Sequence, residues 1–465
     1  MITLDDLSYT YPEQDSPALC NISLHVSPGE CICIAGHSGC GKTTLLLALK
    51  GLLPEGELSG RIRSGGNTLT REEILSGFGL VFQNADSQLL CSTVFDEVAF
   101  GPENLCVPPA EIYERIINAL ADVDLLESGN RNVERFSAGQ KQRLCIASVL
   151  SMRPGVILLD EPTSQLDGKG RNDLLTVLQQ LKGQGISILI AEHNIKPFIS
   201  IIDRYYLMAD GRITGVQDQP PDEYRAGLHG IISHAEHQGK KTGEEKLVSA
   251  ENLSVSYSGC SNILCDCKLE IGVGELLHLY GENGCGKSTL LKTIAGAIQA
   301  DSGSLAICGR NLPKAGELLG TVALLFQNPQ RQLFEDTVRD EVAFTLKRLK
   351  LPNNEIELRV ESALTLSEAL HLEDRLPLTL SFGEQHRVAL ASVIAPEPKL
   401  LLLDEPFAGL DPLQRLRLLK ILSRLRDQRG TTIVIASHDP LPDPDWADRV
   451  ITMQHGRIIS PEATL

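Results

Sequence analysis

The chain has 465 residues, enough for two or three domains with sizeable cores, and its composition is that of a globular protein. It carries 43 Lys plus Arg against 60 Asp plus Glu, a net charge of −17, so its surface as a whole does not suit a polyanion such as nucleic acid. With no apolar run of the roughly 20 residues that cross a bilayer and no signal-peptide pattern, we expect a cytosolic protein whose 12 cysteines are reduced and structural.

The first distinctive motif is GHSGCGKTT at residues 36–44, which follows the apolar run ECICIA and precedes the helix-forming stretch LLLALK. It fits GxxxxGK[ST], the phosphate-binding loop, whose glycines let backbone N–H groups and a helix N-terminus face phosphates. The lysine adds a positive charge, and the hydroxyl after it can reach Mg²⁺. We therefore predict ATP binding at Gly36, Gly39, Gly41, Lys42, Thr43 and Thr44, with Mg²⁺ at Thr43.

Further along, the apolar spacing becomes helical between residues 83 and 137, as in EIYERIINALADVDLL. On either side, apolar β runs alternate with helix-period segments, which is typical of a mostly parallel sheet covered by helices. The pattern predicts an α/β core with an inserted helical subdomain.

The apolar run GVILLDE at residues 155–161 predicts a buried strand that ends in Asp160 and Glu161. Ligands bind at the carboxyl ends of strands in such sheets. We expect Asp160 to hold Mg²⁺, directly or through water, and Glu161 to act as a general base for water. Because Pro162 follows, a simple helix N-cap is the alternative interpretation.

The second half of the chain repeats the first. Lys42 and Lys287 lie 245 residues apart, LLDEP recurs 244 residues later, and VFDEVAFG at 94–101 returns as VRDEVAFT at 338–345. We predict domains at 1–235 and 247–465, joined by the polar linker EHQGKKTGEEK at 236–246. The second copy predicts ATP and Mg²⁺ binding at Gly281, Gly284, Gly286, Lys287, Ser288, Thr289 and Asp404, with Glu405 as the general base.

Together these motifs resemble an ABC-type ATPase. The resemblance adds glutamine loops, signature motifs (SAGQ at 137–140, SFGE at 381–384), D-loops (165–167, 409–411) and switch histidines. It implies two tandem P-loop domains, each with a RecA-like parallel core and an antiparallel β edge region. It also implies catalytic roles for Gln83, Gln327, His193 and His438, with both glutamines also near Mg²⁺.

The resemblance further implies that each nucleotide meets the signature of the opposite domain. One site would then join Lys42, Thr43, Gln83, Asp160, Glu161 and His193 to Ser381 and Gly383; the other would join Lys287, Ser288, Gln327, Asp404, Glu405 and His438 to Ser137 and Gly139. Tyr11 and Tyr257 fall where the family stacks adenine, although an aromatic residue near a strand end is commonly part of the core.

The signature motifs of both copies depart from the family's usual sequence. The second signature has Phe382 and Glu384 where a small residue and Gln are common, so the hydrolysis rate of the site that contains Lys42 is open. Cys40 and Cys285 lie inside the phosphate-binding loops, where backbone N–H groups are expected to lower the pKa of a thiol. A small residue that fills a tight turn is the alternative.

The segments after the glutamine loops, QNADSQLLCSTVFDEVAFGPENL and QNPQRQLFEDTVRDEVAFTLKRL, resemble the paired ATPases of energy-coupling factor importers. This implies ATP hydrolysis at the cytoplasmic face of the membrane that drives uptake of a vitamin or metal ion. The implied partners are a transmembrane coupling subunit and a substrate-binding membrane subunit, with no nucleic acid. The alternatives are a tandem sugar-importer ATPase, a non-catalytic scaffold, and a soluble tandem ABC ATPase acting on ribosomes or nucleic acid.

Overall fold

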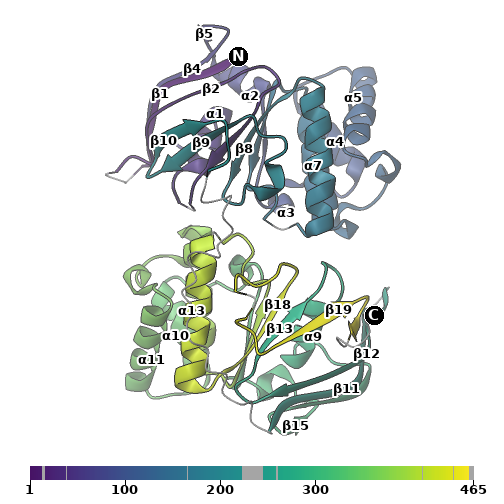
Figure 1. Ribbon diagram of the computed structural model, residues 1–465, viewed down its shortest axis with the longest axis vertical. Coiled ribbons are helices and arrows are strands. Elements are labelled where there is room, and N and C mark those ends of the chain that lie inside the picture. Colours follow the sequence, from purple (N-terminus) through teal and green to yellow (C-terminus); the bar gives the residue numbers. More distant parts are fainter. Residues whose placement is uncertain are drawn as a thin grey trace. The chain divides into compact units, whose positions relative to one another are not determined.

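The computed structural model describes residues 1–12, 16–37, 39–164, 166–221, 245–257, 260–410, 412–443 and 445–459. The chain divides into two units, Met1–His229 and Gly230–Leu465, here called the first and second domains (Figure 1). Of the expected linker, 236–244 lies outside the described residues, and Lys246 is already the first residue of strand β11 (Lys246–Tyr257). Gln165 and Asp411 of the expected D-loops also lie outside them.

The parallel sheet of the first domain is buried on both faces. Alternate residues of strand β3 explain this arrangement: Cys31 and Cys33 enter one core with the helices, whereas Ile32 and Ile34 enter another with the antiparallel sheet. Among the described residues the sheet has the order β10–β9–β3–β8–β7–β6, parallel except for the pair β9–β10. Its strands are β3 (Cys31–Ala35), β6 (Phe78–Val81), β7 (Val156–Asp160), β8 (Ser187–Glu192), β9 (Arg204–Ala209) and β10 (Arg212–Gln217).

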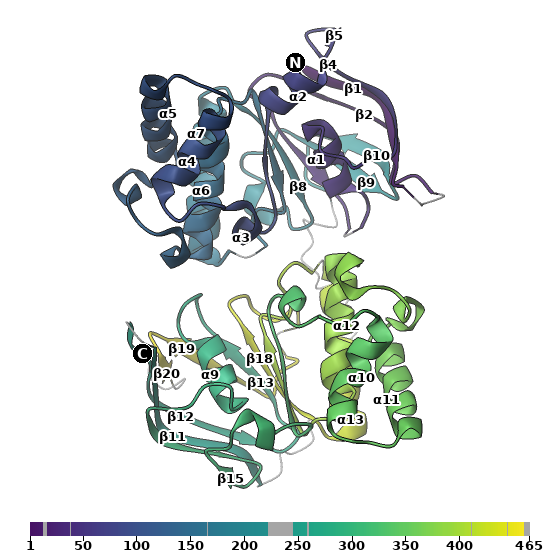
Figure 2. The same ribbon diagram turned by 180° about the vertical axis from the view of Figure 1, so that it is seen from behind.

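An antiparallel sheet of order β2–β1–β4–β5 flanks this core, and Figure 2 shows it on the side opposite to helices α3 to α6. Its strands are β1 (Ile2–Thr10), β2 (Leu19–Val26), β4 (Glu57–Ser64) and β5 (Asn67–Thr68).

The helices of the first domain are α1 (Lys42–Lys50), α2 (Arg71–Gly77), α3 (Ala85–Gln88), α4 (Val94–Asn104), α5 (Pro109–Asp122), α6 (Ala138–Leu150) and α7 (Gly168–Gly183). The expected helical subdomain, after residue 83, is therefore confirmed.

The second domain repeats this plan, with a parallel core of order β16–β17–β18–β13–β19–β20 and an antiparallel sheet of order β12–β11–β14–β15 in its described part. The remaining strands are β12 (Cys260–Gly272), β13 (Leu276–Tyr280), β14 (Ser302–Ile307), β15 (Arg310–Asn311), β16 (Val322–Leu325), β17 (Leu400–Asp404), β18 (Thr432–Ser437), β19 (Arg449–Gln454) and β20 (Arg457–Ile459). The helices are α9 (Lys287–Ile294), α10 (Val338–Arg348), α11 (Asn353–Leu366), α12 (Phe382–Ile394) and α13 (Pro412–Arg429).

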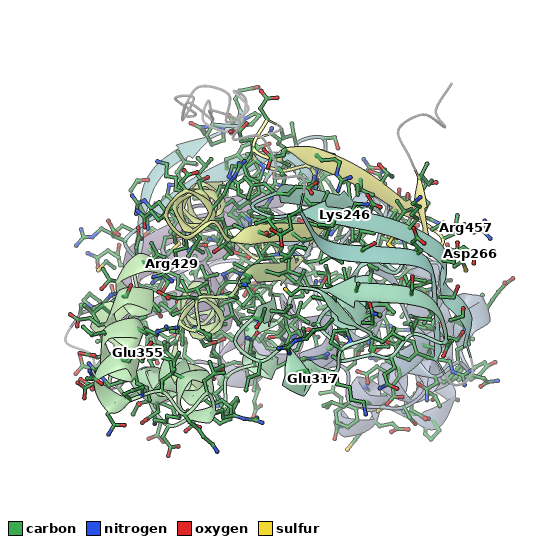
Figure 3. The ribbon with its side chains drawn as sticks, turned by 90° about the horizontal axis from the view of Figure 1, so that it is seen from below. Lys246, Asp266, Glu317, Glu355, Arg429 and Arg457 are labelled. Atoms are coloured by element: carbon green, nitrogen blue, oxygen red, sulfur yellow. The ribbon has the colours of Figure 1, made fainter. Side chains whose placement is uncertain are left out.

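Figure 3 shows Glu355 of α11 and Arg429 of α13 on the helical side of this domain, with Lys246 and Asp266 on the antiparallel sheet. The backbone also repeats in detail, since Asp124 and Arg153, with φ of 55° each, have the left-handed counterparts Glu368 and Glu397. Within the described ranges, no helix combines the length and apolarity needed to cross a membrane.

Candidate functional site

Three strands of each parallel sheet end level with one another, and this brings their loops together. In the first domain β8 lies between β3 and β7, with Ala35 paired to Glu192 and Asp160 paired to Ala191. The phosphate-binding loop after β3, the carboxylates at the end of β7 and His193 after β8 therefore meet at one edge. This edge is where α/β sheets bind ligands.

The phosphate-binding loops have the backbone that the motif requires. Gly41 and Gly286, with φ of 105° and 107°, start helices α1 and α9 in the left-handed conformation. A Cβ on Gly36 would lie 2.3 Å from the Met208 carbonyl oxygen, so only glycine fits there. Ser38 of the first loop lies outside the described residues.

The loop lysines are held in place by their own loops. Nζ of Lys42 donates to the carbonyl oxygens of Gly36 and His37 at 2.8 and 2.9 Å. Nζ of Lys287 donates to those of Gly281 and Glu282 at 2.6 and 3.0 Å. Both lysines are therefore oriented toward the inside of the loop, where a phosphate group would share their charge.

A hydroxyl and a carboxylate from separate elements meet beside each loop. The Thr43 hydroxyl donates to Oδ2 of Asp160 at 2.8 Å, and the Ser288 hydroxyl donates to Oδ1 of Asp404 at 2.9 Å. Burial, and then the neighbouring Glu161 charge, raise the pKa of Asp160 to about 7. Burial also raises the pKa of Asp404.

These groups suit a divalent cation. Oδ1 of Asp160 is buried without a hydrogen-bond partner, and a cation next to it would favour the charged carboxylate. Mg²⁺ typically takes one or two carboxylates together with substrate phosphates. Across the described residues no group of three or more His, Cys, Asp or Glu side chains could hold a metal.

The glutamates after these aspartates sit at the centre of each cluster. Glu161 and Glu405 have φ of 42° and 48°, a conformation that non-glycine residues rarely adopt, and each precedes a proline, which normally favours extended backbone. The Glu161 carboxylate lies 3.9 Å from Lys42 Nζ and 3.3 Å from His193 Nδ1. The Glu405 carboxylate lies 3.2 Å from Lys287 Nζ and 2.9 Å from His438 Nδ1.

The glutamine loops differ between the domains. Nε2 of Gln83 donates to Oε2 of Glu161 at 2.9 Å, as expected for a residue of the cluster. Gln327 is exposed, and no hydrogen bond joins it to Glu405, although both residues are described. The structure thus places Gln83 in the first cluster but leaves Gln327 outside the second.

The two candidate adenine-stacking tyrosines also differ. Tyr11 is half-buried after β1, and its hydroxyl lies 3.0 Å from Oγ1 of Thr44 on the loop helix α1. Tyr257 ends β11 with 43% of its surface exposed. Tyr11 is therefore tied to the phosphate-binding loop, whereas Tyr257 is open to solvent at the strand end.

The signature motifs begin helices α6 and α12. Ser137 and Ser381 are exposed N-cap residues, with Gly139 and Gly383 in the first turn. The hydrogen bonds of both serines stay within the first turn of their own helices, where backbone N–H groups of the helix start are available to an anion.

Comparison with known proteins decides the family. Residues 19–164 and 264–408 each match the model of the family described as ABC transporter. This chain belongs to the ABC transporter family. A Methanosarcina mazei protein that carries the name "Putative ABC transporter ATP-binding protein" is 36% identical over 478 residues, covering 100% of this chain and 95% of that protein.

A protein of the same name from Methanosarcina acetivorans is 35% identical over 485 residues, covering 100% of this chain and 90% of that protein. Among solved structures, cbiO1 from Clostridium perfringens, titled as part of the ABC transporter complex cbiONQ, is similar with 36% identity and a TM-score of 0.44, covering 47% of this chain and 88% of that chain. As a tandem ABC ATPase, the chain binds ATP and hydrolyses it.

One expectation about this ABC ATPase is wrong. Burial raises the pKa of the Cys40 and Cys285 thiols, because it outweighs the lowering effects of the adjacent lysine and of the backbone N–H groups. Each of these cysteines is only 7% exposed. Both observations favour the alternative interpretation, a small residue that fills a tight turn.

Sequence reasoning missed one functional candidate, the buried carboxylate of Glu192. It precedes His193 and accepts a hydrogen bond from the Thr163 hydroxyl at 3.0 Å. Aligning the two halves of the chain would have pointed to this residue. Thr163 and Glu192 align with Phe407 and Ser437, so the pair differs between two halves that otherwise share their motifs.

Proposed function

We propose that this ABC ATPase is the energy-coupling subunit of an importer, of the energy-coupling factor type, that takes up a vitamin or metal-ion micronutrient. It would work at the cytoplasmic face of the membrane, with a transmembrane coupling subunit and a substrate-binding membrane subunit. The observation that carries the proposal is a pair of exposed apolar side chains, Leu90 and Phe334, at equivalent positions after the two glutamine loops.

The chemistry proposed for each site follows from its contacts. The loop N–H groups with Lys42 or Lys287 bind the phosphates, and Glu161 or Glu405 accepts the proton of the attacking water. His193 and His438, whose Nδ1 atoms lie 3.3 and 2.9 Å from these glutamates, would contact the γ-phosphate. Mg²⁺, when bound, neutralises charge on the phosphates, and Thr43 with Asp160, or Ser288 with Asp404, would hold it.

The role of the signature helices rests on the family resemblance. In our proposal Ser381 and Gly383 complete the site of the first domain, and Ser137 and Gly139 complete that of the second. A helix start with exposed N–H groups supports this role, because it suits the γ-phosphate of a nucleotide held elsewhere.

In each helical subdomain, a buried glutamate holds the backbone of the loop that carries the exposed apolar side chain. Oε2 of Glu97, only 3% exposed, accepts from the backbone N–H groups of Leu90 and Cys91 at 2.8 Å each. Glu341, also 3% exposed, accepts from those of Phe334 and Glu335 at 2.8 and 2.9 Å. These glutamates belong to the repeated DEVAF motif, which thereby fixes the loop and turns its apolar residue outward.

The two presented surfaces are chemically different. Leu90 is 70% exposed, whereas Phe334 is 59% exposed and packs edge-on against Phe344 at 4.8 Å, with the Arg348 guanidinium 5.9 Å from that ring. Arg331, three residues before Phe334 in the chain, adds an exposed cation. Large exposed apolar side chains on a fixed loop are typical of a protein-binding surface, and the difference supports one asymmetric membrane partner.

The test co-expresses the chain with the membrane genes that neighbour its own. We expect the wild-type protein to sediment with membranes, and Phe334→Glu and Leu90→Glu to release it while ATP binding is kept. Leu358→Glu is the matched control, because Leu358 is 68% exposed on α11 of the same subdomain as Phe334. A protein that stays soluble with these partners and co-purifies with ribosomes would instead support the soluble-factor interpretation.

A further inference from the structure

Two tyrosines near the end of β1 are attached to the helix that follows the phosphate-binding loop. Tyr9 is 1% exposed in the core that β1 shares with α1, and its hydroxyl donates to the carbonyl oxygen of Pro54, shortly after α1, at 3.1 Å. The hydroxyl of Tyr11 shares a hydrogen bond with that of Thr44, in the first turn of α1, at 3.0 Å. The two side chains therefore tie the end of β1 to both ends of this helix.

The rings of these tyrosines also contact each other. Residues two apart in an extended chain point to the same face, and the two rings meet edge-to-face, with 4.9 Å between centroids and 78° between planes. Tyr9 is firmly placed, because at this residue β1 pairs with β2 through Leu19 and with β4 through Leu58. Tyr11 is thus held at two points, by the Tyr9 ring and by the Thr44 hydroxyl.

The second domain has a tyrosine at the same place without these two restraints. Val255 stands where the first domain has Tyr9, so no aromatic ring is available to Tyr257 from that position. Thr289 is the counterpart of Thr44, and within the described ranges no hydrogen bond joins it to Tyr257, which is 43% exposed. A side chain with this freedom must be ordered when a ligand stacks on it, and the ordering reduces affinity.

We propose that Tyr9 and Thr44 hold Tyr11 in place as a platform for the adenine ring, which gives the first domain an advantage over the second in binding adenine nucleotides. Tyr9 is a positioning residue in this arrangement, because it touches Tyr11 and acts through it. The inference rests on the adenine-stacking role that the family resemblance implies for Tyr11. A platform that is already ordered avoids the cost that Tyr257 must meet on binding.

The test measures binding of ADP and of inorganic pyrophosphate, which carries no base, by isothermal titration calorimetry. Lys287→Ala weakens the site of the second domain, so that the heat reports on the first. In this background Tyr11→Phe keeps the ring and removes its bond to Thr44, and we expect the Kd for ADP to rise about threefold or more. Tyr9→Leu removes the ring contact and should raise this Kd by a similar factor. The Kd for pyrophosphate should stay within about twofold of the background value in both variants, because only a base stacks on the platform.

Two matched controls leave the platform as it is. Tyr257→Phe in a Lys42→Ala chain removes the corresponding hydroxyl of the second domain, which no bond joins to Thr289. Tyr9→Phe keeps the ring and loses only the bond to Pro54. In each control we expect the Kd for ADP to stay within about twofold of its background value.

The outcomes separate positioning from stacking. An unchanged or tighter affinity of Tyr11→Phe for ADP overturns the inference, and a tighter one would mean that Tyr11 blocks the Thr44 hydroxyl in the empty chain. Equal losses of affinity for ADP and pyrophosphate overturn it as well, because they indicate a general disturbance of the loop. Tyr11→Ala tests the stacking role itself, with an expected rise of roughly tenfold or more in the Kd for ADP. An unchanged Kd there would overturn that role, whereas a loss in Tyr11→Ala alone would keep it and overturn the part assigned to Tyr9 and Thr44.

Thermal unfolding of each variant checks that the fold is intact. Should Tyr9→Leu unfold, Tyr11→Phe, which changes a half-buried side chain by one hydroxyl, carries the test with the same expected and contradicting outcomes.

Discussion

The Ser381 hydroxyl donates a hydrogen bond to the Glu384 carboxylate across 2.7 Å, at the start of the second signature helix. In the first signature helix the equivalent Gln140 is neutral, and Ser137 Oγ instead accepts from the Gln140 backbone N–H group at 3.3 Å. The Ser381 proton is therefore committed within its own turn, and a negative charge lies beside the serine that is proposed to meet a phosphate. Both effects oppose anion binding.

Glu384→Gln should therefore raise ATP turnover at the site proposed to contain Lys42. Removing one like charge near a phosphate is worth on the order of 1 kcal/mol, or about fivefold in rate. Steady-state phosphate release measures the effect. The reciprocal change, Gln140→Glu, should lower turnover at the other site, and a fall in both variants would contradict the electrostatic explanation.

The double variant Glu161→Gln, Glu405→Gln should bind ATP and hydrolyse it very slowly. The amide keeps the shape of each side chain but cannot accept the proton of water, and loss of a general base costs roughly 100-fold or more. Nucleotide binding and phosphate release are measured on the same preparation. Hydrolysis within about threefold of the wild-type rate would remove both glutamates from the proposed chemistry.

The local motifs predicted most of each site because strand, loop and helix follow one another in the chain. Gly36 to Thr44 are contiguous, and Asp160 and Glu161 end an apolar strand, so their common edge follows from a parallel sheet. The Thr163–Glu192 bond could not be predicted in this way, because it joins the loop after β7 to the end of strand β8, 29 residues further along the chain. The thiol pKa of Cys40 was predicted in the wrong direction because local N–H groups are visible in the sequence and burial is not.

Asp160→Asn should change how stability depends on pH. The folded chain holds a proton on Asp160 up to a pKa of about 7, against an ordinary value of 3.8, so the folded state binds more protons than the unfolded state between these values. The contribution of this carboxyl to stability is thus complete below about pH 4 and is lost as the pH rises to 7. The asparagine variant avoids the buried charge.

In the absence of nucleotide, the unfolding temperature of Asp160→Asn should therefore exceed that of the wild type by a margin that grows between pH 5 and pH 8. Addition of Mg²⁺ and ATP should then stabilise the wild type more than the variant. Thermal unfolding at both pH values tests this, and an advantage that shrinks with rising pH would show that Asp160 is already charged in the folded chain.

His386→Gln should make the second domain less sensitive to acid. Burial lowers the pKa of His386 from 6.5 to about 4, so between these values the unfolded chain binds a proton that the folded chain excludes. Stability is then lost as the pH falls through this window.

Gln142 occupies the same place in the first domain and is also buried, so glutamine fits the environment of His386. The fall in unfolding temperature between pH 7 and pH 5 should be smaller in the variant, and Gln142→His should enlarge it. Equal falls in all three chains would mean that His386 takes up its proton while folded.

The pairing of signature and loop can be tested by crossing two changes. Lys42→Ala removes a phosphate ligand of the first domain, and Ser381→Arg blocks the helix start that is proposed to complete the same site. Because either change disables that site, the double variant should lose no more ATP turnover than the more damaged single variant. Lys42→Ala combined with Ser137→Arg affects two sites, so those losses should add and leave little turnover. Phosphate release from the wild type, the three single variants and the two double variants measures both combinations. The opposite pattern, with additive losses for Lys42 and Ser381, would mean that each domain completes its own site, since only changes that act on separate sites are expected to add.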